Sequence, residues 1–241
     1  NADHTFTAAV YGQSVHYMKN GEWKDIDNSI VLNQEGRYEN KGNDFQVSFA
    51  KEASDEKLIT VSKDGHGLEW KLLNSLPAPI FMKKNKSKAK NMEVANLKSK
   101  VTYKNVRNGM DLEYILSSKD LKENIILSRP LEDGCLTFEI KTDLELIKKD
   151  NKIIFVTGEK ESVFTMAAPY MFDADGQMSY GIDIQCHLME EEGKILYMLI
   201  PDREWLNASE RKWPVTIQST SIGIGRSLIN FELPELKPAD M

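Results

Sequence analysis

The sequence predicts an all-β protein, an antiparallel β-sandwich-like fold made of one large lobe or two packed lobes. Asn-Gly and Asp-Gly pairs recur between short runs in which apolar and polar residues alternate. Such a run covers one face of a sheet, because successive side chains of a strand point to opposite faces. Helical periodicity is nearly absent over the 241 residues. We therefore expect many hairpins and at most a short helix.

The first hairpin is predicted at Asn20-Gly21, between the runs 15–19 and 22–26. Both central residues of a type I′ turn need a positive φ, which asparagine and glycine adopt most readily. The same argument predicts turns at Asp64-Gly65 and Asp175-Gly176, and Glu190-Glu191-Glu192-Gly193 indicates a hairpin loop between two apolar strands.

Further strands are predicted by period-two runs in which every second residue is apolar. They are Phe45 to Phe49, Met110 to Leu116, Ile195 to Leu199 and Trp213 to Ile217. The one helical candidate is 202–209, where Asp202 follows a proline and can cap a turn or two. This short helix is expected to hold Trp205 and Leu206 against the core.

The segment Lys83 to Lys90 divides the chain, with five lysines and no acidic residue. We expect a solvated loop between a β lobe at 1–98 and a second at 99–221. The alternative is a docking patch for an anionic glycan or nucleic acid. The segment lacks the aromatic and arginine side chains that such contacts usually use.

Composition indicates an ordinary, mildly acidic surface, with 28% charged residues and a formal charge of -6. Such a chain has no general attraction to phosphate backbones, so nucleic acid is not expected as a partner. No apolar run reaches the ~18 residues that a membrane span needs. The start, Asn1-Ala2-Asp3-His4, lacks a signal pattern, so the protein either is not exported or has lost its signal.

Cys135 and Cys186 are the two cysteines, and strand parity separates them. In 182–188 the apolar residues are even-numbered, which puts Cys186 on the buried face; in 135–140 the even positions are again apolar, which turns Cys135 outward. Opposed faces make a disulfide awkward. We expect two unpaired thiols.

Asp173 and Asp175 offer two carboxylates in one loop, as calcium sites do. A calcium loop needs further oxygen ligands at fixed offsets, where Met178 and Ile182 stand instead. A hairpin turn accounts for the same residues with fewer assumptions.

Catalytic patterns are missing at the other candidate positions. Ser14 and His16 lack the second glycine of a nucleophile elbow, and Cys186 and His187 are adjacent in a strand, so their side chains diverge. Gly223-Ile224-Gly225-Arg226-Ser227 lacks the third glycine of a dinucleotide fingerprint. Paired acids for glycoside hydrolysis leave no local pattern, so this class stays open. No metal, cofactor, catalytic residue or specific binding residue is predicted.

Several stretches together resemble a bacterial module. They are 21–28, 101–114, 122–127, 168–176 and 204–217. The module precedes DNRLRE domains in exported, wall-associated proteins of Gram-positive bacteria, including proteins with RHS or YD repeats. The resemblance implies export and a long multidomain parent, and it assigns 222–241 to a strand of a following DNRLRE-like domain.

The sequence-based hypothesis is therefore an extracellular module, secreted or attached to the cell wall, that is not an enzyme. As an adhesin, it would bind a host glycoprotein such as an immunoglobulin, or a glycan. Two alternatives remain: a structural spacer or platform that contacts neighbouring domains of a large wall-associated or toxin protein, and a cryptic glycan-acting hydrolase.

Overall fold

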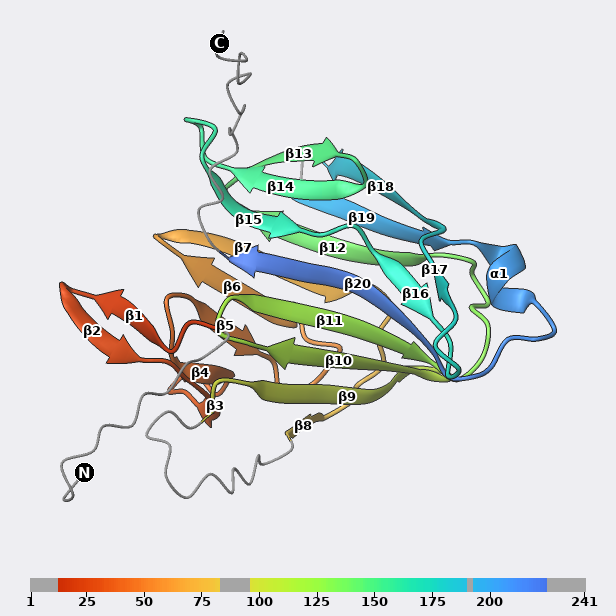
Figure 1. Cartoon of the computed structure of the whole chain (residues 1–241), viewed down its shortest axis with the longest axis horizontal. Helices are drawn as coiled ribbons and strands as arrows, with labels where there is room; N and C mark the ends of the chain where they lie inside the picture. The colour runs from red at the N-terminus through yellow and green to blue at the C-terminus, as the bar shows by residue number, and fades with distance from the viewer. Residues whose placement is uncertain (1–12, 83–95, 190–192, 225–241) are drawn as a thin grey trace, which may run out of the picture.

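Two large antiparallel sheets form the body of the protein (Figure 1). The structure is a computed structural model, and it describes residues 13–82, 96–189 and 193–224. The two sheets are packed face to face around one apolar core, so the expected all-β, sandwich-like fold is confirmed.

The first sheet has eight strands in the order β18-β19-β12-β7-β6-β5-β4-β3. Its strands are β3 (Asp27–Leu32), β4 (Tyr38–Gly42), β5 (Gln46–Phe49), β6 (Ile59–Lys63), β7 (His66–Leu72), β12 (Leu136–Thr142), β18 (Ile182–Met189) and β19 (Lys194–Pro201). The turn predicted at Asp64-Gly65 joins β6 to β7, and both of its residues have a positive φ.

The second sheet has ten strands, eight of them in the order β13-β14-β15-β20-β11-β10-β9-β8. They are β8 (Ile80–Met82), β9 (Ser99–Arg107), β10 (Met110–Leu116), β11 (Asp120–Leu127), β13 (Glu145–Lys149), β14 (Lys152–Val156), β15 (Ser162–Met166) and β20 (Val215–Ile224). The small hairpin of β16 (Tyr170–Phe172) and β17 (Met178–Ser179) joins the edge of β20 beyond β15.

Two smaller elements lie at opposite ends of the sandwich (Figure 1). The hairpin of β1 (His16–Lys19) and β2 (Glu22–Asp25) is a separate two-stranded sheet. The helix α1 (Arg203–Asn207) begins at Asp202, whose Oδ1 accepts hydrogen bonds from the backbone N–H groups of Glu204 (2.9 Å) and Trp205 (3.2 Å). The predicted cap is therefore confirmed.

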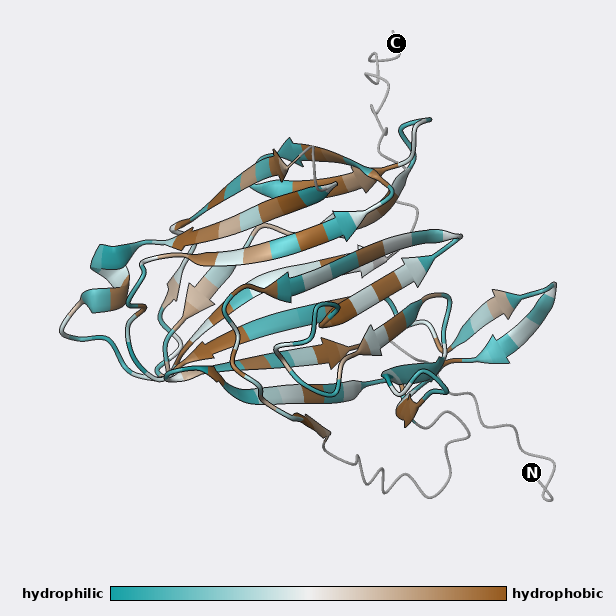
Figure 2. Ribbon diagram, turned by 180° about the vertical axis from the view of Figure 1, so that it is seen from behind, coloured by the Kyte–Doolittle hydropathy of each residue, from teal (hydrophilic) through white to brown (hydrophobic). Residues whose placement is uncertain are grey.

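The core consists of the inward residues of both sheets, and alternating bands along the strands show the same period (Figure 2). In β10 and β11 every second residue is buried. Aromatic rings bridge the layers: the ring centroids of Phe49 in β5 and Tyr114 in β10 are 5.8 Å apart. Leu206 of α1 is also buried in this core, as expected.

The sheets contain strands from both sides of the expected lobe boundary between residues 98 and 99. Strands β12, β18 and β19, from the second predicted lobe, lie in the same sheet as β3 to β7 from the first. The two-lobe division stays a prediction, and it does not coincide with the division between the layers. Residues 83–90, 190–192 and 225–241 lie outside the described residues, so the lysine loop and the acidic loop are not placed. Of the segment 222–241 assigned to a following DNRLRE-like domain, 222–224 form the end of β20 and pair with β11 and β15.

Candidate functional site

The β1–β2 hairpin presents exposed apolar side chains at one end of the molecule. Asn20 and Gly21 have φ values of 53° and 79°, as the predicted type I′ turn requires. This turn sets the register that puts Met18 directly opposite Trp23. Trp23 is 70% exposed and Met18 48% exposed, so the pair presents adjoining apolar area to solvent.

A pocket of about 430 Å³ lies beside this hairpin. The indole of Trp23 and the side chains of Ile26 and Phe45 contribute apolar wall, and Asn43, Asp44, Ser118 and Lys119 contribute polar groups. The Oγ of Ser118 is buried and has no hydrogen-bond partner among the described residues. A buried hydroxyl without a partner is uncommon in folded proteins, so this pocket holds a polar group that a ligand could satisfy.

The pocket wall is held in place by polar contacts below it. The Asn43 side chain donates to Asn28 Oδ1 (3.1 Å) and to the carbonyl of Ser117 (3.4 Å), which ties the eight-stranded sheet to the β10–β11 turn. Asp44 forms an ion pair with Lys63. Asn43 and Asp44 are therefore fixed before any ligand arrives.

The Ser14 and His16 pair lines the same pocket, and its geometry is not that of a nucleophile and base. His16 Nδ1 lies 2.7 Å from Asp25 Oδ1, its cross-strand neighbour. No hydrogen bond joins Ser14 to His16 in the described part of the chain. The pair belongs to the hairpin base, as the sequence indicated.

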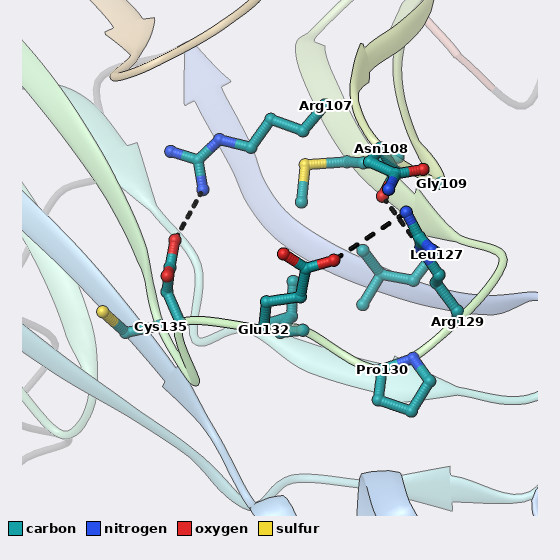
Figure 3. Close-up of a pocket in the computed structure, with 11 residues that line it drawn as sticks. Arg107, Asn108, Gly109, Leu127, Arg129, Pro130, Glu132 and Cys135 are labelled. Carbon is teal, nitrogen blue, oxygen red and sulfur yellow. Dashed lines mark hydrogen bonds and ion pairs between the residues drawn. The ribbon is translucent and has the colours of Figure 1, made fainter.

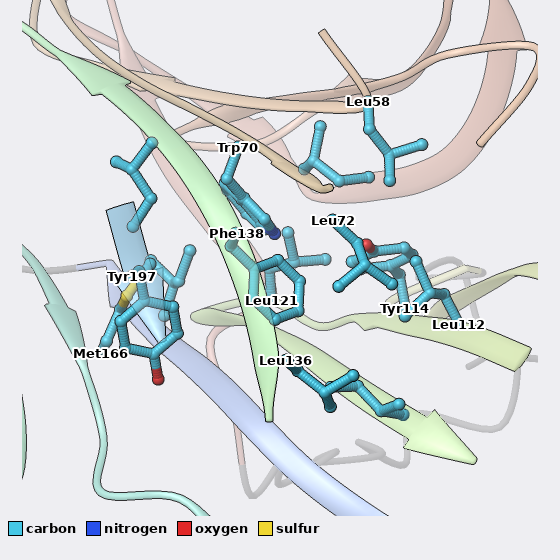
Figure 4. Close-up of a cluster of buried hydrophobic side chains, with 14 of the residues drawn as sticks. Leu58, Trp70, Leu72, Leu112, Tyr114, Leu121, Leu136, Phe138, Met166 and Tyr197 are labelled. Atoms are coloured by element: carbon cyan, nitrogen blue, oxygen red, sulfur yellow. The ribbon is translucent and has the colours of Figure 1, made fainter. Parts of the chain in front are cut away.

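A second polar site, missed by the sequence analysis, is buried between the sheets. Glu123 of β11 accepts hydrogen bonds from Tyr114 Oη (2.6 Å), Trp70 Nε1 (3.2 Å) and Ser219 Oγ (2.6 Å). Figure 4 shows the apolar side chains, with Trp70 and Tyr114 among them, that fill this layer. Burial raises the pKa of Glu123, although the three hydrogen bonds oppose the rise.

A β-bulge brings Ser219 to this carboxyl group. Thr220 pairs with Glu123 and Gln218 pairs with Asn124, so Ser219 is the extra residue of β20. Both Ser219 and Thr220 are buried, because the bulge shifts the inward phase of the strand by one residue. The signal in the sequence was an acidic residue at an apolar position, between Leu121 and Ile125 on the inward face of β11.

Asp173, the candidate calcium ligand, is already fully bonded within the protein. Its Oδ1 accepts from the N–H groups of Asp175 (3.1 Å) and Gln177 (2.9 Å), and its Oδ2 lies 3.0 Å from Arg211 Nη1. Burial acts to raise the pKa of Asp173, but these hydrogen bonds outweigh it and lower that pKa. The turn interpretation accounts for the two bonds to Oδ1, and the ion pair with Arg211 engages Oδ2.

The remaining candidates do not converge. Cys135 and Cys186 are free thiols, and Cys186 is only partly buried because β18 is an edge strand. Burial raises the pKa of the Cys186 thiol. Within the described ranges, no three His, Cys, Asp or Glu side chains are grouped as a metal site would require. No helix in these ranges is long and apolar enough to cross a membrane.

Comparison with known proteins gives a consistent group of relatives. Over 232 residues, or 92% of this chain, it is 23% identical to the tRNA3(Ser)-specific nuclease WapA of Bacillus spizizenii and to the tRNA nuclease WapA of Bacillus subtilis. Over 182 residues it is 25% identical to a wall-associated protein of Geobacillus stearothermophilus, of which the aligned region covers 70%. No family model and no solved structure matches the chain.

The chain spans about a tenth of the length of the two nucleases. The relatives agree with the expected wall-associated protein of Gram-positive type and with its extracellular or cell-wall location. The DNRLRE and RHS parts of the resemblance stay predictions. None of these relatives is named for a host, so the host partner and the adhesin role also stay predictions.

The expectation that the protein is not an enzyme is wrong, because three of the relatives are named as tRNA nucleases. The chain has 241 residues, whereas each nuclease is about ten times as long as the aligned region.

Proposed function

We propose that the chain is a structural β-module of a large wall-associated protein with a nuclease activity, a platform that positions neighbouring domains of the same polypeptide. The observation that carries the proposal is the alignment, which covers 92% of this chain but about a tenth of the nuclease relatives. A single continuous core supports it, since such a unit folds by itself within a longer chain.

The geometry favours the hairpin end as the place where neighbours dock. Ser14, close to the start of the described chain, lines the pocket together with Lys119. Asp120 pairs with Gly223, close to the last described residue. Both ends of the described chain thus lie at the end of the sandwich that carries the β1–β2 hairpin, where Trp23 and Met18 offer apolar area to a neighbouring domain.

Limited proteolysis of a longer natural fragment, with the neighbouring domain attached, tests the platform. We expect the junction to resist cleavage, and a Trp23→Ser variant to lose that resistance because the docking contact is removed. Tyr180→Ser is the matched control, since Tyr180 is 72% exposed and belongs to the opposite end near β17. A junction that is cleaved freely in the unmodified fragment, or equally well protected in the Trp23→Ser variant, refutes the platform.

A second candidate function is glycan binding at the same pocket. The apolar face of a sugar ring packs well on an exposed indole such as Trp23, and sugar hydroxyls bind amide, carboxylate and hydroxyl groups such as those of Asn43, Asp44 and Ser118. Titration with soluble N-acetylglucosamine oligomers should quench Trp23 fluorescence saturably. An unchanged response in the Trp23→Ser variant would remove this candidate.

A further inference from the structure

A small hollow of about 70 Å³ is shown in Figure 3. It lies beside the β9–β10 turn, at the end of the sandwich away from the first hairpin (Figure 1). The β9–β10 turn, 107–110, forms one wall. The connection 128–135, which leaves the ten-stranded sheet after β11 and enters the eight-stranded sheet at β12, forms the other. The hollow is thus built where the chain crosses from one layer to the next.

Two arginines of this hollow have hydrogen-bond donors without partners. Arg107 donates one bond from Nη2 to the carbonyl of Leu73, and Arg129 donates one from Nε to the carbonyl of Asn108 (3.3 Å). Arg107 Nε and Arg129 Nη2 are buried and have no hydrogen-bond acceptor among the described residues. Buried donors are nearly always paired in folded proteins, so two on one hollow indicate an acceptor that the chain itself does not supply.

Two acidic side chains lie near these arginines, but neither forms a hydrogen bond with an unpartnered donor. Glu132 Oε1 is 3.8 Å from Arg129 Nη2, and Asp133 Oδ2 is 4.0 Å from Arg107 Nη1. Both distances are too long for hydrogen bonds. The two carboxylate side chains are 78% and 79% exposed, so they can move away from the arginines at little cost.

We propose that this hollow binds a peptide carboxylate carried on an apolar stem. A carboxylate suits two separate donors, because each of its two oxygens can accept a charged hydrogen bond from a different arginine. With Glu132 and Asp133 nearby, the hollow carries no large excess of positive charge, so a single negative charge meets less repulsion there than the two charges of a phosphate. Met110, Leu127 and Leu131 supply the apolar wall against which the stem packs.

Binding is measured on the whole chain by NMR, following the arginine Nε–H signals. The probe is N-acetyl-leucine, its amide is the uncharged control ligand, and inorganic phosphate is the third ligand. We expect saturable shifts of the Arg107 and Arg129 signals with the acid alone. Arg129→Gln should weaken binding by about tenfold or more, the usual worth of one charged hydrogen-bond partner.

Lys104→Gln is the matched control variant, because it likewise removes one positive charge, but at an exposed position of β9 outside the hollow. It should change the affinity by less than about twofold. Equal binding of the amide, tighter binding of phosphate, an unchanged affinity in Arg129→Gln, or no saturable shift at all would each overturn the proposal. None of these results depends on the platform function, whose test lies at the opposite end.

Discussion

Glu123 places one carboxyl group inside an otherwise apolar interface between two sheets. Its three hydrogen-bond donors come from three strands: Trp70 from β7, Tyr114 from β10 and Ser219 from β20. The carboxyl group therefore fixes the position of one sheet relative to the other. The bulge in β20 places Ser219 where it can donate the third hydrogen bond. Burial makes this arrangement sensitive to pH.

Stability should fall as pH rises through the folded-state pKa of Glu123. That pKa is raised by burial above its ordinary value of 4.5, so the folded protein holds the proton more tightly than the unfolded chain does. The stabilising effect is complete below about 4.5 and is lost above the raised pKa. Glu123→Gln keeps an acceptor for Trp70 and Tyr114 and abolishes this slope, so denaturant unfolding from pH 4 to 8 should show a flatter profile for the variant.

Glu123→Leu provides the contrast at the same position. It leaves the donors of Trp70 and Tyr114 buried without an acceptor, and each such loss costs about 1–3 kcal/mol. At pH 5 the free energy of unfolding should therefore fall several times further in Glu123→Leu than in Glu123→Gln. Equal stability of the two variants would show that the carboxyl does not organise this interface.

Arg211 is the second residue whose substitution should lower the stability of the whole protein. Its side chain is 3% exposed, it lies 3.0 Å from Asp173 Oδ2, and its guanidinium carbon stands 3.4 Å from the centroid of the Trp205 ring. Arg211→Gln should lower Tm clearly more than Lys212→Gln, because it leaves a buried carboxylate without its cation. Thermal unfolding at pH 7 measures the difference.

The ion pair between Asp173 and Arg211 should stop contributing to stability at low pH. The pKa of Asp173 is lowered, so its contribution to stability is present above the ordinary value of 3.8 and is lost only as pH falls through the lower folded-state pKa. Below that point the stability difference between Arg211→Gln and the unmodified protein should narrow to what the contacts of Arg211 with Trp205 contribute. A constant difference down to pH 2 would mean that the ion pair is not what Arg211 contributes.

At the scale of elements, substitution by alanine should lower stability by different amounts in two turns whose glycines both have a positive φ. Gly21, at φ +79°, has nothing within 4 Å of the added Cβ, whereas Gly109, at φ +74°, would put it 2.8 Å from Ser128 Oγ and 2.9 Å from Arg129 Cγ. Gly21→Ala should cost about 1–2 kcal/mol from backbone strain alone, and only within the hairpin. Gly109→Ala should cost more and disturb the arginine hollow.

Hydrogen exchange distinguishes these outcomes. Gly21→Ala should raise exchange in β1 and β2 while leaving β9 to β11 unchanged, because the hairpin is a separate two-stranded sheet. Gly109→Ala should raise exchange along β9 and β10 and shift the Arg129 signals. Loss of protection throughout the molecule in Gly21→Ala would contradict the independence of the hairpin.

The elements were predictable to the extent that local rules determine them. Asn20-Gly21 and Asp64-Gly65 fix turns through their own backbone preferences, and Asp202 caps α1 with its own side chain. The partners of each strand were not predictable, because β7 pairs with β12 across 63 residues of intervening chain for reasons of global packing. The arginine hollow was missed for the same reason: 107–110 and 128–135 meet only after the sheets have formed.

At the scale of the whole molecule, the layers interleave the two predicted lobes. The eight-stranded sheet contains five strands from before residue 98 and three from after it, β12, β18 and β19. The inner face of β5 to β7 packs on strands of the other sheet, as the contact between Phe49 and Tyr114 shows. The sandwich therefore has one core. Either half of the chain alone would leave part of that core exposed to solvent.

This arrangement predicts that the fragment 13–98 will not fold by itself, whereas 13–224 will unfold in one cooperative step. In 13–98 the strand β7 lacks β12 as its partner, and Trp70, whose Nε1 bonds to Glu123, has no acceptor. Far-ultraviolet circular dichroism and tryptophan fluorescence in urea should give coincident transitions for 13–224 and no sigmoidal transition for 13–98. A cooperative transition in the short fragment would show instead that the lysine segment separates two domains, each with a core of its own.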